Sequence, residues 1–247
     1  MRHPFATGGN FIAFLIFLGV CLLSLFNACV YPDAHMEKTR TKALRVAVTG
    51  GAGSGKTAVC NRFKELGIKV ISADALAREA VAPNSTAHKK IVDFFGETVL
   101  LKDATLNRKM LRRMIIKDAA ARLALERIVH PEISNLMREK ITCAENQGCK
   151  IVVIEVPLLF ELNMDEQFDR IVLVSAGREL RVKRLMARDN ISRDEAENLI
   201  HVQMPDTDKI RRADFVLWNE GSTARLIEAV DLLYENSFNH TKKRKSP

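Results

Sequence analysis

The sequence predicts an α/β fold in which a doubly wound parallel sheet of about five strands is covered by helices on both faces. Two observations carry this prediction. Short apolar runs rich in β-branched residues alternate with longer helical stretches from residue 44 onward, and this alternation is typical of parallel sheets. With 47% hydrophobic and 28% charged residues in a chain of 247, the composition favours one domain with a buried core and excludes a largely disordered protein.

An apolar segment precedes the predicted domain. Residues 11–30 contain no charged side chain, and their number suits a membrane-spanning helix. Basic residues are concentrated between 38 and 45, whereas only Arg2 precedes the segment, so an anchor of this kind would hold the following domain in the cytoplasm. Met36 would also open a complete cytosolic sequence. Residues 1–35 are therefore an anchor, a misassigned start or a cleaved targeting signal.

The first predicted strand, Leu44 to Thr49, leads into the strongest motif of the sequence. Residues 50–57 (GGAGSGKT) match G-x-x-x-x-G-K-[ST] in full, and a helix is predicted over 56–66. Glycine backbone amides and a helix N-terminus bind phosphate, while Lys56 would neutralise phosphate oxygens and Thr57 would ligate Mg²⁺. The fold is therefore predicted to be of the P-loop NTPase type and to bind a nucleotide, although the motif alone does not name the reaction. The expected contacts are Gly51, Ala52, Gly53, Ser54, Gly55, Lys56, Thr57 and Ala58.

A carboxylate follows the second predicted strand, Ile68 to Ser72. Asp74 would lie at the carboxyl edge of the sheet, beside the phosphate loop. At this position it could take a proton from an acceptor hydroxyl, or it could cap the helix that follows. Position alone leaves both roles open.

The next segment, residues 74–146, is predicted to be mostly helical, with Pro83, Gly96 and Pro131 as interruptions. His130 precedes one of these prolines, and composition alone favours a structural helix junction there. The third strand, Ile151 to Glu155, ends in an acidic residue. Glu155 resembles a Walker-B acid that supports Mg²⁺ through water, and the alternative is a surface charge at the strand end.

A fourth strand is predicted over 170–174, followed by helices over 179–189 and 192–201. Arg181, Arg184 and Arg188 recur at spacings of three and four, which aligns them on one helix face. Such a row could close over a triphosphate. The pattern alone favours a solvated basic face paired with neighbouring acids.

The domain is predicted to close with a strand over 215–218 and a helix over 223–234. Residues 237–247 are predicted to be a disordered basic tail, because half of the net charge of +8 lies in the last six residues. The remaining charge is mild and suits phosphorylated small molecules as well as it suits nucleic acid. For the chain as a whole we expect small-molecule substrates and no nucleic-acid partner. The five cysteines show neither a metal-binding pattern nor a disulfide framework.

Several motifs occur in order between residue 44 and about residue 235. They are VAVTGGAGSGKT, GIKVISADALARE, LNRKMLR, VHPEI, VIEVPLLFE, RVKRLMARD, a helix that ends at Gln203, and ADFVLWNEGS. Together they resemble the dephospho-coenzyme A kinase family. The resemblance implies a kinase domain over 44–236 that uses ATP and Mg²⁺ to phosphorylate the ribose 3′-hydroxyl of dephospho-coenzyme A. The products would be coenzyme A and ADP, in the last step of coenzyme A biosynthesis in the cytoplasm.

The resemblance also implies roles for individual residues. Asp74 would be the base that faces the 3′-hydroxyl, and Lys56 and Arg184 would be catalytic with it. Arg184 and Arg188 would be lid arginines that contact phosphates, and Asn219 would lie near the adenine of ATP.

The acceptor would bind in a helical region over about 74–149, with Arg108 and His130 directed toward it. A small lid would span about 178–205. The chain departs from the family at Ser72, where Asp is common, and this departure puts a supporting role for that acid in doubt.

Two alternatives to this kinase remain at the level of sequence. A nucleoside monophosphate kinase would need an acceptor site for a second nucleotide base, and the motifs do not favour one. The other alternative is a non-catalytic, membrane-tethered nucleotide-binding protein. Ser72 and residues 11–30 are the only features that support it.

Overall fold

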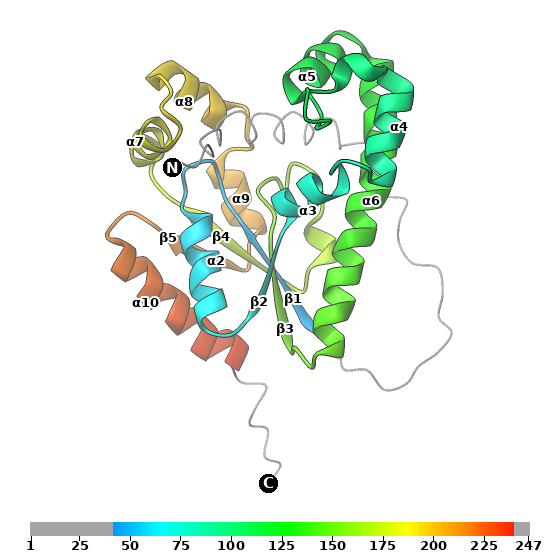
Figure 1. Cartoon of the computed structure of the whole chain (residues 1–247). Helices are drawn as coiled ribbons and strands as arrows, with labels where there is room; N and C mark the ends of the chain where they lie inside the picture. Colours follow the sequence, from blue (N-terminus) through cyan, green and yellow to red (C-terminus); the bar gives the residue numbers. More distant parts are fainter. Residues whose placement is uncertain (1–41, 240–247) are drawn as a thin grey trace, which may run out of the picture.

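The computed structural model describes residues 42–239, which form a five-stranded parallel sheet with helices on both faces (Figure 1). The strands are β1 (Leu44–Thr49), β2 (Lys69–Ser72), β3 (Ile151–Glu155), β4 (Arg170–Ser175) and β5 (Phe215–Trp218). Their order across the sheet is β2-β3-β1-β4-β5. All neighbouring pairs are parallel, which confirms the predicted fold class.

Nine α-helices are described within the same residues. They are α2 (Lys56–Glu65), α3 (Ala73–Ala80), α4 (Thr86–Phe95), α5 (Arg108–Lys117), α6 (Ala119–Asn146), α7 (Arg178–Asp189), α8 (Arg193–His201), α9 (Asp206–Arg212) and α10 (Thr223–Leu233). None of the helices within residues 42–239 is both long and apolar enough to cross a membrane. The predicted apolar segment, residues 11–30, lies outside the described residues, as does the basic end of the chain.

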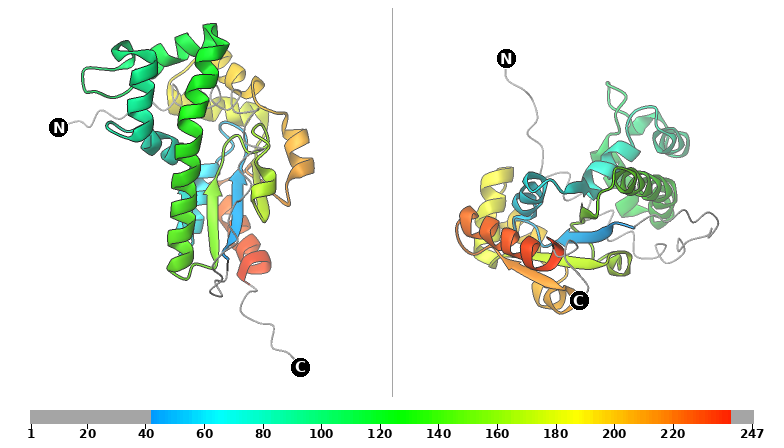
Figure 2. Two further views of the ribbon diagram at one scale, coloured as in Figure 1. Left: turned by 90° about the vertical axis from the view of Figure 1, so that its right-hand side faces the viewer. Right: turned by 90° about the horizontal axis from the view of Figure 1, so that it is seen from below.

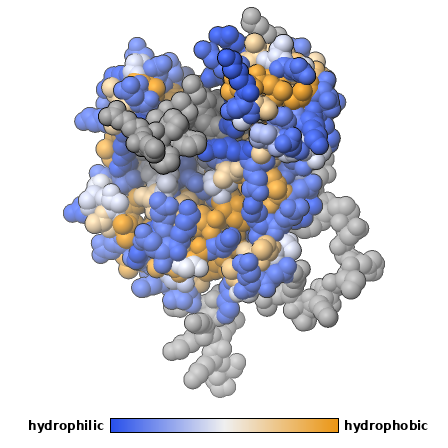
Figure 3. Space-filling model, in the orientation of Figure 1, coloured by the Kyte–Doolittle hydropathy of each residue, from blue (hydrophilic) through white to orange (hydrophobic). Residues whose placement is uncertain are grey.

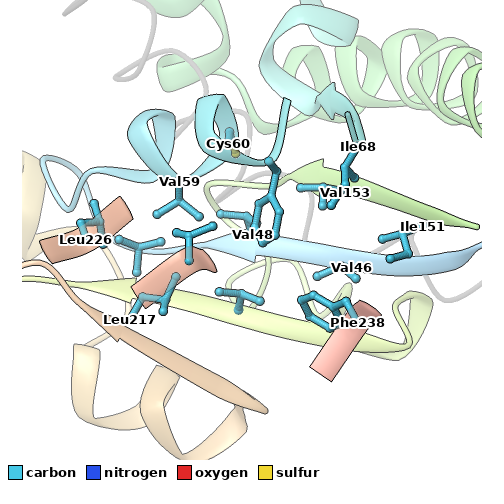
Figure 4. Close-up of a cluster of buried hydrophobic side chains, with 14 residues drawn as sticks. Val46, Val48, Val59, Cys60, Ile68, Ile151, Val153, Leu217, Leu226 and Phe238 are labelled. Carbon is cyan, nitrogen blue, oxygen red and sulfur yellow. The ribbon is translucent and has the colours of Figure 1, made fainter. Parts of the chain in front are cut away.

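The buried core lies on both faces of the sheet, because side chains alternate between the two faces along each strand. Val46 and Val48 face α2 and α10, while Ala47 between them faces α6, because successive side chains of a strand point to opposite faces. Figure 4 shows the first of these clusters, with Val46 and Val48 beside Val59 of α2 and Leu226 of α10. Both faces of the sheet are therefore apolar, as continuous β-branched strands require.

Helix α6 runs without a break through Pro131, so the predicted interruption there is wrong. One half of α6 packs on the sheet through Ile141 and Ala144, and the other half packs on α4 and α5 through Leu125 and Val129. Figure 2 shows α6 extending from the sheet to this helical region. The packing of both halves of α6 compensates for the stability lost with the backbone hydrogen bond that Pro131 cannot donate.

The carboxyl edge of the sheet lies between two helical parts. Helices α3 to α6 stand on one side of it, and α7 and α8 on the other (Figure 1). Figure 3 shows apolar residues gathered over the end of the molecule that carries α4 and α5, where Phe94, Leu101 and Ile116 are exposed. The two helical parts fall almost entirely within residues 74–149 and 178–205, for which acceptor binding and a lid remain predictions.

The folded part extends beyond the predicted domain end at residue 236. After α10, a π-helical turn spans Tyr234–Phe238. Phe238 is buried, and its ring centroid lies 5.8 Å from that of Phe215 and 6.4 Å from that of Phe63. The predicted tail, residues 237–247, therefore begins too early, because aromatic burial holds Phe238 in the core.

Candidate active site

A cavity of about 570 Å³ lies at the carboxyl edge of the sheet, between the phosphate loop and α7. The predicted site residues that line it are Ala52, Gly53, Gly55, Lys56, Thr57, Asp74, Glu155, Arg184 and Arg188. They come from the loop after β1 and the start of α2, from α3, from the end of β3 and from α7. Parallel strands end at one edge, so segments far apart in the sequence meet there.

The phosphate loop wraps around its own lysine. Nζ of Lys56 donates to the carbonyl oxygens of Gly50 at 2.8 Å and Gly51 at 3.0 Å. Gly55 precedes α2 with φ +103°, and a side chain there would collide with the Asn219 amide. Thr57, in the first turn of α2, is exposed and lines the cavity. The loop thus has the arrangement that binds phosphate at a helix N-terminus.

The surroundings of Lys56 change the pKa of its ammonium group. Burial lowers the pKa of Lys56 to about 8, with Lys209 and Arg181 acting in the same direction and Glu155 and Asp74 opposing them. The ammonium form still predominates at neutral pH. Phosphate oxygens placed beside it would favour this form further.

Asp74 lies in the first turn of α3 and does not cap it. The cap is Ser72, whose hydroxyl accepts from the backbone amide of Ala75 at 3.4 Å. The capping role considered for Asp74 is therefore wrong, and the departure at Ser72 supplies the cap. Oδ1 of Asp74 is buried and has no hydrogen-bond partner among the described residues, so it is available to a substrate hydroxyl.

Asp74, in the first turn of α3, and Glu155, at the end of β3, bring two carboxylates to the same cavity. Burial raises the pKa of Asp74 to about 6, and the negative charge of Glu155 acts in the same direction, while Lys56 opposes both. Glu155 is in register with Ser72 of β2. A carboxyl with a pKa near 6 is a better proton acceptor than an ordinary aspartate and is still mostly ionised at pH 7.

The oxygen atoms in the cavity suit a magnesium ion. The Thr57 hydroxyl and the carboxylates of Asp74 and Glu155 line the same space, and Mg²⁺ prefers hard oxygen donors. No group of three or more His, Cys, Asp or Glu ligands occurs in the part of the chain that the structure describes. Mg²⁺ in kinase sites takes one or two carboxylates and fills its other positions with water and substrate phosphate, so the residues present fit the ion.

The three arginines of α7 have different surroundings. Arg184 lines the cavity, and its Nη2 donates to the backbone and side-chain oxygens of Asn219, both at 3.2 Å. Arg188 lines the cavity from an exposed position and pairs with Asp189 at 2.7 Å. Arg181 is only 4% exposed and pairs with Asp206. The solvated face favoured by the spacing is thus wrong for Arg181, because its guanidinium lies against the phosphate loop at Gly51 and Ala52 and pairs with Asp206 at the start of α9, a helix that was not predicted.

Some predicted residues lie away from the cavity. Asn219 is buried behind the loop, where its Nδ2 donates to the Ser54 carbonyl at 2.8 Å. Arg108 begins α5 and His130 lies within α6, and neither lines the cavity. Burial lowers the pKa of His130 to about 4, and burial with a nearby Arg78 lowers that of Arg108. Gly51, Ser54 and Ala58 also fall outside the lining.

The cavity also includes residues that the sequence analysis did not assign to the site. They are Pro157, Leu158, Ala187 and Gln203. Oε1 of Gln203 accepts from the Ala52 amide at 2.7 Å, so Ala52 does not offer this amide to a phosphate. The only sequence signal for Gln203 was its place at the end of a helix in one motif.

The five-stranded parallel sheet and the lysine-bearing phosphate loop facing a buried carboxylate define a P-loop phosphotransferase. A family model for dephospho-CoA kinase matches residues 44–225. The chain belongs to the dephospho-CoA kinase family. It is an enzyme that phosphorylates dephospho-CoA at the expense of ATP, the last step of coenzyme A biosynthesis.

Individual relatives agree with the family model. The chain is 42% identical over 179 residues to a dephospho-CoA kinase of Syntrophotalea carbinolica, covering 72% of this chain and 85% of the relative. It is 38% identical to one of Geobacter sulfurreducens, covering 78% and 98%. Among solved structures, TT1252 of Thermus thermophilus matches with a TM-score of 0.69 and 33% identity over 78% of this chain and 97% of that one. Neither alternative function receives support from these relatives.

Proposed function

We propose that the cavity carries out in-line phosphoryl transfer with Asp74 as the general base. The ribose 3′-hydroxyl of dephospho-CoA gives its proton to Asp74, its oxygen forms a bond to the γ-phosphorus, and the bond to the β,γ-bridging oxygen breaks to release ADP. The observation that carries this proposal is the unpartnered, buried Oδ1 of Asp74 in the same cavity as Lys56 and Arg184. A base must reach the proton it removes, and this geometry allows it.

Positive charge around the transferred group would come from the loop and from α7. Lys56 would contact the β- and γ-phosphates, since its Nζ already lies against the loop carbonyls. Arg184 would exchange its bonds to Asn219 for phosphate oxygens, and Arg188 would approach from the lid. Positively charged side chains that are already in position would then stabilise the negative charge that develops on the phosphoryl group in the transition state.

The Thr57 hydroxyl would ligate Mg²⁺ directly, and Glu155 would hold it through water. Bound Mg²⁺ neutralises charge on the β- and γ-phosphates of ATP. Asp74 then remains free for the acceptor, which is consistent with its role as the base.

The acceptor would bind along the helical region of residues 74–149 and present its ribose to Asp74, which lines the cavity, and residues 178–205 would close over ATP. Arg108 and His130 lie in this acceptor region, and we propose that they contact dephospho-CoA beyond its ribose. His130 would act there as a neutral hydrogen-bonding group, because its pKa is about 4.

We place the kinase domain in the cytoplasm. If residues 11–30 anchor it, the basic residues that follow them favour a cytoplasmic side. A chain translated from Met36 would lack this segment altogether. Fractionation of cells that express the full chain separates the two cases.

The assay that tests this proposal supplies the full chain with ATP, Mg²⁺ and dephospho-CoA and follows both products. Coenzyme A and ADP are expected in equal amounts. AMP and other nucleoside monophosphates serve as competing acceptors and are expected to give no transfer. ADP without coenzyme A would contradict the proposal, because the phosphoryl group would then be passing to water or to another acceptor.

The pH profile of kcat/KM is expected to fall about tenfold per unit below pH 6. Asp74 has a raised pKa, near 6, so it is ionised and active above this pH and protonated below it. A second fall is expected above about pH 8, where Lys56 loses its proton. The acidic pH dependence is measured at constant ionic strength with saturating Mg²⁺.

The residual rate of Asp74→Asn provides the matched control. A fall in kcat/KM at low pH that is caused by protonation of ATP would persist in this variant. A fall caused by protonation of Asp74 would disappear. A wild-type rate that stays constant from pH 5 to 6.5 would rule out Asp74 as a base with a raised pKa.

A further inference from the structure

Two side chains hold the phosphate loop on either side of Ala52. The Ala52 amide donates to Oε1 of Gln203 at 2.7 Å, and the Ala52 carbonyl accepts from Nε of Arg181 at 2.9 Å. Both bonds are buried. Arg181 belongs to α7 and Gln203 follows α8, so the two contacts come from the two ends of the lid.

Each of these two hydrogen bonds orients a whole planar peptide group, including the polar group at its other end. In a trans peptide the C=O and N–H groups point in opposite directions. The peptide between Gly51 and Ala52 gives its N–H to Gln203, and its other end, the Gly51 carbonyl, accepts from Nζ of Lys56 at 3.0 Å. Gln203 therefore helps to set the position of the catalytic lysine.

The next peptide along the loop is oriented in the same way by Arg181. Its carbonyl, that of Ala52, points to the guanidinium, so its N–H, that of Gly53, points in the opposite direction. Gly53 lines the cavity. Arg181 therefore directs a loop amide to where phosphate would bind.

Arg181 is itself fixed by a carboxylate. Its Nη1 lies 3.0 Å from both carboxylate oxygens of Asp206, and the Ser175 hydroxyl donates to Oδ2 of Asp206 at 3.0 Å. Arg181 is buried and Asp206 is partly buried, and such an ion pair contributes little net stability compared with apolar side chains of the same volume. The geometry of this pair is better explained by the orientation that it imposes on Arg181.

The phosphate loop leaves space for the Arg181 guanidinium at Gly51. A Cβ atom at Gly51 would collide with the guanidinium of Arg181. The motif G-x-x-x-x-G-K-[ST] accepts any residue at this second position, and Gly51 does not have a left-handed φ. Space for Arg181 is thus the reason for glycine here, which is an observation independent of the hydrogen bonds.

We propose that Arg181 and Gln203 are positioning residues for ATP, which act through the two peptide groups that flank Ala52 and link the phosphate loop to both ends of the lid. The proposal rests on ATP binding at the loop. It predicts that loss of either side chain impairs the use of ATP and leaves the affinity for the acceptor unchanged.

The test separates positioning from stability with a double replacement. Arg181→Met leaves Asp206 without its partner, so Tm is expected to fall by roughly 5 to 15 °C. It is also expected to lower kcat/KM for ATP roughly 10- to 100-fold, the loss typical of a hydrogen bond from a charged group. Adding Asp206→Leu removes the unpaired carboxylate, so Tm is expected to recover. The Ala52 carbonyl still lacks its donor, so the ATP defect is expected to remain.

Gln203→Met keeps the size of the side chain, introduces no charge and is expected to lower kcat/KM for ATP roughly tenfold. It keeps the test informative if the double variant does not fold. Lys183→Met, at an exposed position of α7, is the matched control and should behave as wild type.

Binding of a non-hydrolysable ATP analogue is measured for each variant beside Tm and the KM for dephospho-CoA. Weaker analogue binding by both Gln203→Met and the double variant supports the proposal, even if wild type transfers to a different acceptor. Wild-type kcat/KM for ATP in a double variant with restored Tm would overturn it, as would a defect confined to the acceptor KM.

Discussion

Asp74→Asn is expected to lower kcat by roughly 10²- to 10⁴-fold, the contribution typical of a general base. The amide has the same shape as the carboxylate but cannot accept the proton of the 3′-hydroxyl. The loop that binds phosphate is unchanged, so affinity for ATP should stay within a few-fold of wild type. Turnover is measured by coenzyme A formation, and ATP affinity by titration with a non-hydrolysable analogue.

Asp93→Asn is the control for this variant. Asp93 is an exposed carboxylate of α4 and does not line the cavity, so its replacement should leave turnover unchanged. Normal turnover in Asp74→Asn would refute the assignment of Asp74 as base. Loss of ATP binding along with turnover would instead indicate that Asp74 supports the nucleotide site.

Lys56→Ala is expected to reduce kcat/KM for ATP by roughly 10²- to 10³-fold or more, as removal of a preorganised charge at the reacting group does. Nζ of Lys56 lies against the loop that would hold the phosphates, and no other described lysine lines the cavity. Burial already disfavours the charged form of this side chain, so the fold should not depend on it. Tm is expected to change by only a few degrees.

Lys64→Ala, at an exposed position of α2, tests whether loss of any positive charge from this helix has the same effect. We expect wild-type kinetics from it. A Lys56→Ala enzyme with unchanged kcat/KM for ATP would contradict the proposed role in phosphate binding. A large fall in Tm would point to a structural role instead.

The strands and the phosphate loop could be predicted because their signals are local. All five predicted strands agree with the structure to within one residue at each end, since a buried parallel strand is a short β-branched run between turns. The glycines and the Lys-Thr pair of the loop are contiguous in sequence. The signal for Asp74 was also local, because it directly follows a strand.

Predictions from the sequence are wrong where contacts between distant elements decide the structure. The break predicted at Pro131 is absent, because both halves of α6 are held by tertiary packing. Helix α9 was not predicted, because its seven residues, DTDKIRR, have no apolar periodicity. The pairing of Arg181 with Asp206 of α9 could not be predicted for the same reason, and a spacing rule alone placed this arginine in solvent.

The sequence by itself determined the fold class, the phosphate loop and the family, because each depends on residues that are adjacent or regularly spaced. Only the tertiary structure decided that Asp74 shares a cavity with Glu155 and Lys56. It also decided that Arg184 and Arg188 of α7 line the cavity, whereas Arg181 is buried against the loop. These outcomes depend on distances between separate elements and on exclusion of water from the space between them, and neither is encoded in the spacing of residues along one helix.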